Sequence, residues 1–474
     1  MKPITIAFLI FFIGGLFTND AAYSADKRNV QMSSDLTGII SIDHSSGMST
    51  ALQNNGAIWT WKGNEPAAKG AVLPNAVQIT TRNIGLKKDG TVWTWDSGAG
   101  NRYFKAKGIT AKINEPIQIE ELKGIKKIES GSIGHLALDE RGEVWYWGED
   151  GCMAWLLRED VKPEACYHLS NDPSDATRFT APLFTSIPAK VVSDIADMDI
   201  ETGVMLATKK GHIYHIGVWD NVHMGEVDLM MSNIMKVAAV SEGRYVAIGL
   251  DKNGYILGTY QTKLSKEKGF VDISAVFNNS IPYLAVHQDG TVWSGHIDKP
   301  APMMQLEGLK GITRVKARST NSGIALAKQG VVYQWGTGET RYDDHALLPF
   351  KAAIKPVKVQ RRFTVILNGK AMKLAAGPVI LNGTTLVPMR DLFEALGAKV
   401  DYENGNITVS SGDLFIKLEV YRHEAEQNGI KKKLTEAVTY YNGKTYIPLR
   451  FIAEAFGAKV SWDASSGTAV VEMQ

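Results

Sequence analysis

Cysteine is scarce in this sequence, and so is any excess of charge. The 474 residues include two cysteines, Cys152 and Cys166, and 52 basic against 50 acidic side chains leave a formal net charge of +2. This balance gives no reason to expect nucleic acid or an acidic surface as a partner. Two cysteines exclude a disulfide-rich scaffold and allow one bridge at most. We expect that bridge to form in an oxidising compartment, and two separate thiols are the alternative.

Motifs of catalysis and of metal binding are also lacking. The chain has no glycine-rich phosphate loop, no G-x-S-x-G turn, no Cys/His zinc spacing and no calcium-loop spacing. Its closest histidine cluster is His212, His215 and His223. His212 and His215 are three apart in an expected strand, so they point to opposite faces and cannot share a metal there. We therefore predict no catalytic residues, no metal and no cofactor, and a protein that is not an enzyme.

Long apolar runs are confined to the N-terminus. Lys2 is followed by ITIAFLIFFIGGLF and then by TNDAAYSAD, with Ala22 and Ser24 at the positions that suit cleavage after Ser24. The apolar run, about 14 residues, is too short to span a bilayer comfortably. We interpret residues 1–24 as a signal peptide, with an uncleaved anchor as the alternative. The protein is then secreted or cell-wall associated, with no membrane span after cleavage.

A loosely repeated phrase fills the middle of the chain. The stretch LKKDGTVWTW, residues 86–95, recurs as LDERGEVWYW, VHQDGTVWSG and LAKQGVVYQW. Alignment on its glycine gives seven copies, spaced on average about 46 residues apart, which suits a four-stranded propeller blade. The seven glycines are Gly56, Gly90, Gly142, Gly211, Gly254, Gly290 and Gly330.

Each copy predicts a strand, a tight turn and a second strand. The residue two places after the glycine is β-branched in all seven copies, as strands with a buried face prefer. Aromatic residues stand three and five places after the glycine in the strongest copies, so Trp93 and Trp95 share one strand face. Eight of the eleven tryptophans lie in this strand. Their fixed spacing from the glycine favours core packing over a sugar- or cofactor-stacking role.

Weaker strand patterns complete the unit. They precede the repeat, as IKKIES does from Ile125, and follow it, as PAKV does from Pro188. An antiparallel meander of four strands places the seven tight turns on one face of the disc, the tight-turn face. The connections between first and second and between third and fourth strands then lie on the opposite face, the insert face. The long inserts are residues 98–115, 148–187 and 217–233, all on the insert face.

The pattern GHLALDERGEVWYWGED, followed by PAKV, resembles the regulator-of-chromosome-condensation repeat. The resemblance covers residues 36–359 and implies a seven-bladed β-propeller. Nuclear members of that family act as nucleotide exchange factors, a role without occasion in an exported protein. Secreted bacterial members include a β-lactamase inhibitor that binds proteins through one propeller face. The resemblance is specific for fold and weak for function.

Residues 363–474 contain a different duplication. The segment VILNGTTLVPMRDLFEALGAKVDY is matched 60 positions later by VTYYNGKTYIPLRFIAEAFGAKVSW. Each half predicts a strand, an Asn-Gly turn, a strand, a short helix and a strand pair. Pro388 and Pro448 suit the first helical position, and Gly397 and Gly457 suit left-handed caps. The chain is thus predicted to be mainly β, a seven-bladed β-propeller followed by a small α+β domain with an internal duplication.

This duplication resembles the copper amine oxidase N-terminal domain, which is widespread in surface proteins of Gram-positive bacteria. The repeated VPMRDLFEALGA and IPLRFIAEAFGA carry the resemblance. In the oxidases this piece is a stalk, separate from a catalytic domain that needs a His-x-His copper pair and a modified tyrosine in an Asn-Tyr-Asp/Glu motif. Neither pattern occurs in this sequence. The resemblance therefore implies no amine oxidation and no copper.

The long inserts hold the residues that we expect to bind a partner. Aromatic and arginine side chains on loops of a rigid scaffold are favoured interface anchors. The tight turns are short and mainly charged or polar, so they offer little apolar area. For each residue of the inserts, packing of its own loop onto the disc is the alternative. The candidate residues are Arg102, Tyr103, Trp155, Tyr167, His168 and Trp219.

These observations together predict an exported bacterial binding protein without catalytic activity. One propeller face would recognise an extracellular protein or a cell-wall polymer, and the C-terminal domain would serve in cell-envelope association or spacing. An inhibitor of an extracellular enzyme is one alternative. A propeller lyase or hydrolase is another, and it would need clustered lysine, tyrosine, histidine or carboxylate side chains over the central channel.

Overall fold

The computed structural model describes residues 30–473 with several gaps. The residues outside the description are 1–29, 32, 46, 97–100, 111, 132–133, 149–186, 201–202, 218–226, 229–232, 239–247, 259–261, 276–281, 298–301, 320–321, 337–355, 442, 464–466 and 474. The chain forms two compact units, Asp35–Arg361 on the one hand and Arg362–Gln474 with Met1–Ser34 on the other. No helix in the described ranges is long and apolar enough to cross a membrane.

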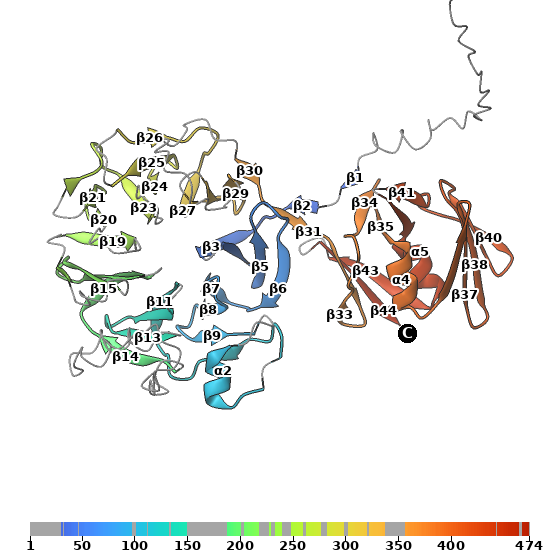
Figure 1. The fold of residues 1–474 in the computed structure, drawn as a ribbon, viewed down its shortest axis with the longest axis horizontal. Coiled ribbons are helices and arrows are strands. Elements are labelled where there is room, and N and C mark those ends of the chain that lie inside the picture. Colours follow the sequence, from blue (N-terminus) through green and yellow to red (C-terminus); the bar gives the residue numbers. More distant parts are fainter. Residues whose placement is uncertain are drawn as a thin grey trace, which may run out of the picture. The chain divides into compact units, whose positions relative to one another are not determined.

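The first unit contains seven four-stranded antiparallel sheets among its described residues, arranged as blades in a ring (Figure 1). Each blade is built from one contiguous stretch of chain, and its first strand lies nearest the axis. The first three blades are β3 (Ile39–Ser45), β4 (Met48–Gln53), β5 (Ala57–Lys62), β6 (Ala68–Val72); β7 (Ala76–Ile79), β8 (Ile84–Lys87), β9 (Val92–Thr94), β10 (Ile117–Gln118); and β11 (Ile125–Ser130), β12 (Gly134–Asp139), β13 (Val144–Gly148), β14 (Ala189–Val192).

Four further blades complete the ring. They are β15 (Ile195–Ile200), β16 (Gly203–Thr208), β17 (Ile213–Gly217), β18 (Val227–Asp228); β19 (Ile234–Ala238), β20 (Ile248–Asp251), β21 (Ile256–Gly258), β22 (Thr262–Lys263); β23 (Phe270–Ala275), β24 (Pro282–His287), β25 (Val292–His296), β26 (Met304–Gln305); and β27 (Ile312–Ser319), β28 (Ser322–Ala327), β29 (Val332–Trp335), β30 (Val357–Lys358). The prediction of a seven-bladed β-propeller is therefore confirmed.

The tryptophans of the repeat pack between blades. Trp59 and Trp61 in β5, Trp147 in β13 and Trp335 in β29 are buried. Trp59 belongs to a core cluster with residues of the last blade, including Val332. The fixed position of these rings after the turn therefore reflects core packing, as the spacing predicted.

The repeated glycines also join each blade to the next. Gly290 has a φ of +82°, and its carbonyl accepts a hydrogen bond of 3.0 Å from Ile312 N at the start of β27. A Cβ at Gly290 would lie 2.7 Å from Gly311 Cα, so no larger side chain fits without displacing backbone. The same bond links Gly330 O to Ile39 N, at 3.0 Å, and closes the ring between the last and first blades. The glycine thus serves the hairpin and the blade junction at once.

The second unit contains three sheets among its described residues. Its strands are β1 (Val30–Gln31), β32 (Thr364–Leu367), β33 (Lys370–Ala371), β34 (Val379–Leu381), β35 (Thr384–Pro388), β36 (Lys399–Glu403), β37 (Asn406–Ser411), β38 (Leu414–Glu419), β39 (Glu424–Gln427), β40 (Ile430–Lys433), β41 (Thr439–Tyr441), β42 (Lys444–Pro448), β43 (Ala458–Asp463) and β44 (Thr468–Met473). The sheet orders are β1-β34-β35-β42-β41, β33-β32-β44-β43 and β36-β37-β38-β39-β40. A separate two-stranded sheet of β2 (Ser33–Asp35) and β31 (Gln360–Arg362) lies where the chain enters and leaves the propeller.

The two halves of the duplication meet at equivalent residues. β35 and β42 pair antiparallel so that Val387 lies opposite Ile447, its counterpart 60 residues later. The internal pseudo-twofold axis therefore passes between these two residues. The helices α4 (Met389–Ala395) and α5 (Leu449–Ala455) follow the paired strands, and they bury Leu392 and Ile452 in the core of the unit. The small α+β domain with an internal duplication is confirmed.

The ends of these two helices differ slightly from the prediction. Pro388 and Pro448 occupy the N-cap, one position before the first helical residue. The proline still costs no helical hydrogen bond there, because its missing N–H lies ahead of the helix. Gly397 and Gly457 have φ angles of +69° and +78° just beyond the helix ends, as the glycine caps predicted.

Candidate functional site

The first strands of the seven blades line a central channel. These strands are β3, β7, β11, β15, β19, β23 and β27. Each carries a bulge near its start, because the register to the second strand skips one residue, as between Ile39 and Ser41 in β3. A bulge leaves the extra residue unpaired and turns its side chain out of the regular alternation.

Polar side chains of these strands form a closed belt around the channel. In one repeated arrangement, an aspartate binds a lysine of the preceding blade and a backbone N–H of the following blade. Asp197 accepts from Lys127 Nζ at 2.6 Å and from Val237 N at 2.9 Å. We call the participating side chains the belt: Asp43, Gln78, Lys127, Asp197, Lys236, Asp272 and Lys316.

The belt bridges every junction between neighbouring blades. Asp272 binds Lys236 and accepts from Val315 N at 2.9 Å, and Asp43 accepts from Thr81 N at 2.8 Å. Gln78 completes the set by exchanging two hydrogen bonds with the backbone of Ile128 in the third blade. Because each member is held by two blades, the belt is a structural ring of charges that fixes the blades around the axis.

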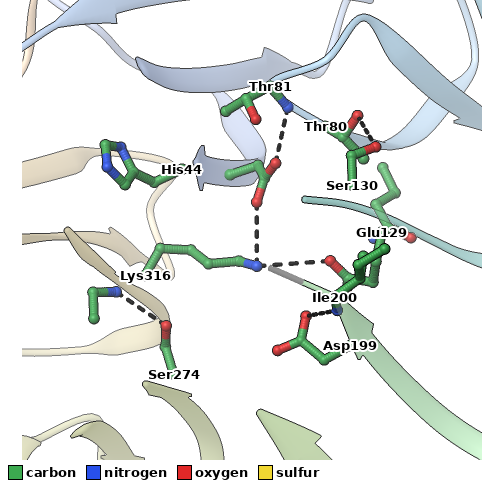
Figure 2. A network of polar contacts seen from close by, with 12 residues as sticks. His44, Thr80, Thr81, Glu129, Ser130, Asp199, Ile200, Ser274 and Lys316 are labelled. Carbon is green, nitrogen blue, oxygen red and sulfur yellow. Dashed lines mark hydrogen bonds and ion pairs between the residues drawn. The ribbon is translucent and has the colours of Figure 1, made fainter. Parts of the chain in front are cut away.

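Lys316 and Glu129 form an ion pair inside the channel (Figure 2). Lys316 Nζ lies 3.2 Å from Asp43 Oδ1 and 3.7 Å from Glu129 Oε2. Burial by itself would lower the pKa of Lys316, but the charges of Glu129, Asp43 and Asp199 outweigh it and raise that pKa well above its usual value. Burial opposes ionisation of Glu129 as well, yet Lys316 and Lys127 keep its pKa below the usual range. Both groups are therefore charged at neutral pH.

This electrostatic arrangement suits structure better than acid–base catalysis. A general base or nucleophile working near neutrality needs a pKa moved toward pH 7. Burial opposes charging of Lys127, but Asp197, Glu129 and Asp199 raise its pKa above the usual range, away from neutrality. Within the described part of the chain, no group of three His, Cys, Asp or Glu side chains is placed to hold a metal ion.

Two serine–histidine pairs stand close to the insert face. His135 Nδ1 lies 2.8 Å from Ser130 Oγ, and His44 Nδ1 lies 3.0 Å from Ser49 Oγ. Burial lowers the pKa of His135 to about 3, with the charge of Arg82 acting in the same direction. Such an imidazole is a weak base. Figure 2 shows that the Ser130 hydroxyl is directed to Thr80, to which it donates at 2.9 Å.

The channel encloses a cavity of about 450 Å³ that reaches the tight-turn face, since its wall includes the bulge residues Lys126, Ala196 and Met235. The equivalent bulge residue of each of the seven blades stands near the start of its first strand, at the tight-turn end of the channel. Four of them, Ile40, Val77, Met235 and Val271, are large apolar side chains, each 43–50% exposed. We call the seven bulge residues the annulus: Ile40, Val77, Lys126, Ala196, Met235, Val271 and Thr313.

The annulus adds exposed apolar side chains to the tight-turn face, although the turns themselves were expected to offer little apolar area. The turns themselves are polar, as predicted, with exposed pairs such as Lys209 and Lys210. The exposed apolar side chains come instead from the bulges of four first strands, as two pairs in neighbouring blades, Ile40 with Val77 and Met235 with Val271. Exposed apolar side chains among polar residues are typical of interaction sites.

Tyr103 is not available as a binding anchor, and its placement among the expected binding residues is wrong. It lies in α2 (Arg102–Lys107), where it is 4% exposed and packs into the core of the second blade. Its hydroxyl donates to Glu121 Oε2 at 2.8 Å. The side chain of Asn101 accepts a hydrogen bond from Tyr103 N at the start of this helix, and Gly108 ends the helix in the left-handed conformation. In the helix so formed, the tyrosine side chain points inward.

The other expected binding residues are not placed by the structure. Arg102 is the first residue of α2, and its side chain lies outside the described residues. Also outside the described residues are Trp155, Tyr167, His168 and Trp219, and the two cysteines, Cys152 and Cys166. Binding by these side chains and the disulfide bridge stay predictions.

The belt left a trace in the sequence that pattern reading missed. Lys127, Asp197, Lys236 and Asp272 all stand at the third position of their first strands. Lysine and aspartate alternating at one repeat position predict contacts between neighbouring repeats. The annulus left a weaker trace, because two adjacent apolar residues at a strand start are equally typical of a strand buried on both sides.

Comparison with known families supports the division of the chain. Residues 366–471 match the family model of the copper amine oxidase N-terminal domain. This stretch is a copper amine oxidase N-terminal domain. The match spans the duplicated halves with both helices, so the resemblance seen in the sequence is confirmed for this domain.

Two curated relatives match about half of this chain through a small part of their own length. Human E3 ubiquitin-protein ligase HERC2 is 29% identical over 273 residues, which cover 53% of this chain and 5% of the ligase. The mouse HERC2 ligase is 30% identical over the same length, with the same coverage. This chain therefore spans 5% of the length of these ligases.

Solved propellers resemble the chain at low identity. Yeast RCC1 (Prp20), crystallised with Kap60, is 18% identical, with 68% of this chain and 74% of that chain covered and a TM-score of 0.36. Hsv2 from Kluyveromyces lactis is 8% identical, with 65% and 96% covered and a TM-score of 0.40. The resemblance to the regulator-of-chromosome-condensation repeat is confirmed at the level of fold by the seven four-stranded blades themselves.

Proposed function

We propose that this chain is an exported, non-catalytic binding protein whose propeller docks another protein at the channel mouth on the tight-turn face. The observation that carries the proposal is the annulus, where Ile40, Val77, Met235 and Val271 are 43–50% exposed and Met235 lines the channel cavity. Burial of such side chains against a partner is worth about 25 cal/mol per Å² of apolar surface. A flat polar disc would offer no comparable gain.

The rigidity of the surrounding scaffold supports this role. The belt ties all seven first strands together, so the annulus residues sit on strands whose positions are fixed from both sides. A preformed surface loses little conformational freedom on association, and binding energy is not spent on ordering it. Export rests on the N-terminal segment of residues 1–24, whose charge and apolar pattern is that of a signal peptide.

The copper amine oxidase N-terminal domain serves in this proposal as a spacer or an envelope-associated module. It follows the propeller directly and forms its own compact unit with its own core. Inhibition of an extracellular enzyme is a special case of the same docking. A lyase or hydrolase at the channel is disfavoured, because the lysines and carboxylates there are engaged with one another and held charged.

The test compares partner capture by matched surface variants. The variant Met235→Glu/Val271→Glu places two charges on adjacent positions of the annulus, and Val357→Glu places one on the exposed outer strand β30 as a control. Proteins from culture fluid and from cell-wall extract are captured on each variant and identified by mass spectrometry. We expect one partner retained by wild type and Val357→Glu and reduced at least about tenfold by the double variant, a loss equal to about 1.4 kcal/mol.

Equal thermal unfolding midpoints for the three proteins show that the comparison concerns the surface and not the fold. A partner that binds the annulus variant as well as wild type contradicts the proposal and places the working surface elsewhere. Failure of the wild-type chain to retain any protein from either fraction also contradicts it.

A further inference from the structure

We propose that the annulus accepts an acidic protein segment, which places an apolar side chain on the annulus and carboxylates against Lys126 and Arg314 of the channel wall. The inference rests on the proposed docking function and adds the chemistry of the partner. The composition alone did not predict such a partner, because a formal net charge of +2 gave no reason to expect an acidic one.

The first step is the inventory of channel charges. Five acidic and five basic residues line the cavity. Lys127, Lys236 and Lys316 form ion pairs with carboxylates of the belt or with Glu129. Within the described part of the chain, Lys126 and Arg314 take part in no ion pair, and both are exposed. The formal charges of the lining therefore sum to zero, and Lys126 and Arg314 are the two cations among them that form no direct ion pair.

The second step is the charge of the surrounding turns. The two residues before each repeated glycine carry six basic side chains against three acidic ones, a formal excess of three. The basic residues of these turns are Lys88, Arg141, Lys209, Lys210, Lys252 and Lys328. The connections between blades hold four lysines and five acidic residues, so they leave this excess nearly unchanged. The tight-turn face is thus basic although the chain is almost neutral.

The third step distinguishes a protein partner from a nucleic acid. A cationic rim alone would suit phosphates, but phosphate contacts gain nothing from four exposed aliphatic side chains. A protein segment can offer carboxylates to the rim and a hydrophobic side chain to the annulus together. Arg314 can hold a carboxylate through two parallel N–H donors, and Lys126 can add a point charge. Charge complementarity of this kind accelerates association and selects partners.

The experiment uses synthetic nine-residue peptides and the full chain. The probe carries a central tryptophan flanked by glutamates, and its matched peptides replace the glutamates by serine, the tryptophan by alanine, or the glutamates by lysine. Binding is followed by isothermal calorimetry at 50 and 300 mM salt, with a short DNA duplex as the nucleic-acid probe. We expect the glutamate–tryptophan peptide to bind at least about tenfold more tightly than every matched peptide and than the duplex, and to weaken as salt rises.

Variants locate the carboxylate contact. Lys126→Ala/Arg314→Ala should weaken the glutamate–tryptophan peptide about tenfold and leave the serine–tryptophan peptide unchanged, a coupling of about 1.4 kcal/mol. The control is Lys62→Ala, which removes an exposed lysine at the end of β5 away from the tight turn. This variant should leave the affinity for both peptides unchanged.

The outcomes separate this inference from the docking proposal. Equal affinity for acidic and serine peptides, or preference for the duplex, overturns the acidic partner while capture by the annulus can still hold. If the annulus variant fails to capture the partner and the chain shows no preference among the peptides, only the inference of an acidic partner is overturned. Equal effects of Lys126→Ala/Arg314→Ala and Lys62→Ala also overturn it.

Discussion

Lys316 Nζ lies 3.2 Å from Asp43 Oδ1 and so ties the first strand of the last blade to the first strand of the first blade. Asp43 in turn accepts from Thr81 N in the second blade. One carboxylate thereby links three consecutive blades across the point where the chain closes on itself. The ring has no exchanged strand there, so side chains and backbone hydrogen bonds such as those from Ile39 N to Gly330 O and from Leu36 N to Val359 O carry the closure.

Removing the closing lysine should destabilise the propeller strongly. Lys316→Met leaves Asp43 buried without its cation and removes one of the two lysines paired with Glu129, and loss of one partner from a buried ion pair costs about 3 kcal/mol. Urea unfolding followed by tryptophan fluorescence measures the change. Lys328→Met, on an exposed turn of the same blade, is the control and should stay within about 0.5 kcal/mol of wild type. An equal loss of unfolding free energy in both variants would show that the belt lysine contributes no more to stability than an exposed lysine.

The buried histidine of the third blade should make stability fall in mild acid. Burial, with the charge of Arg82, lowers the pKa of His135 from 6.5 to about 3, so below pH 6.5 the unfolded chain binds a proton that the folded chain does not. The stability associated with the neutral imidazole is fully present above pH 6.5 and is lost as pH falls toward 3. The free energy of unfolding then falls by about 1.4 kcal/mol per pH unit. His135→Gln should reduce the slope of unfolding free energy against pH between pH 4 and 6 by that amount.

Measurements above pH 7 provide the internal control for this variant. There His135 is neutral in both states, so the difference between wild type and His135→Gln should not change with pH. An unchanged slope between pH 4 and 6 would mean that the imidazole titrates alike in the folded and unfolded chain.

The glycine at a blade junction should tolerate substitution far less than a glycine in an open turn. Gly290→Ala forces a Cβ to 2.7 Å from Gly311 Cα at a φ of +82°, whereas Gly47→Ala meets nothing within 4 Å at a φ of +77°. The positive φ costs either variant about 1 kcal/mol, and the clash adds about 2 kcal/mol or more at Gly290. Thermal unfolding of the two variants measures the difference. Equal losses would show that the junction opens to accept a methyl group.

A buried arginine near the end of β27 should be dispensable. Arg318 is 4% exposed, and its Nη2 donates to Gly63 O at 2.8 Å, while Nε and Nη1 have no hydrogen-bond partner among the residues that the structure describes. Burial lowers the pKa of this guanidinium, which reflects an uncompensated charge. Arg318→Met should therefore raise the free energy of unfolding by about 1 kcal/mol, whereas Arg318→Lys, which keeps the buried charge, should not. A fall on Arg318→Met would reveal an acceptor for those donors.

Much of the architecture followed from local rules. The glycine turns, the β-branched residue two places on and the paired tryptophans fixed the number of blades, because hairpins obey turn chemistry and face alternation within ten residues. The C-terminal duplication was equally legible, since Asn-Gly turns and glycine caps mark the same elements twice. The error at Tyr103 arose because its helix folds against its own blade, and no local pattern distinguishes an inward from an outward aromatic on a short insert.

The sequence by itself determined the fold class, the seven repeats, the second duplicated domain and the absence of recognised catalytic motifs. Only the tertiary structure shows the annulus, on which the proposed working surface rests. The bulges that expose Ile40 and Met235 depend on pairing with a second strand, and a linear alternation of side chains cannot show them. The belt joins Asp43 to Lys316, and the propeller gathers basic turns from five distant repeats on one face, because ring closure brings together residues that sequence separation keeps apart.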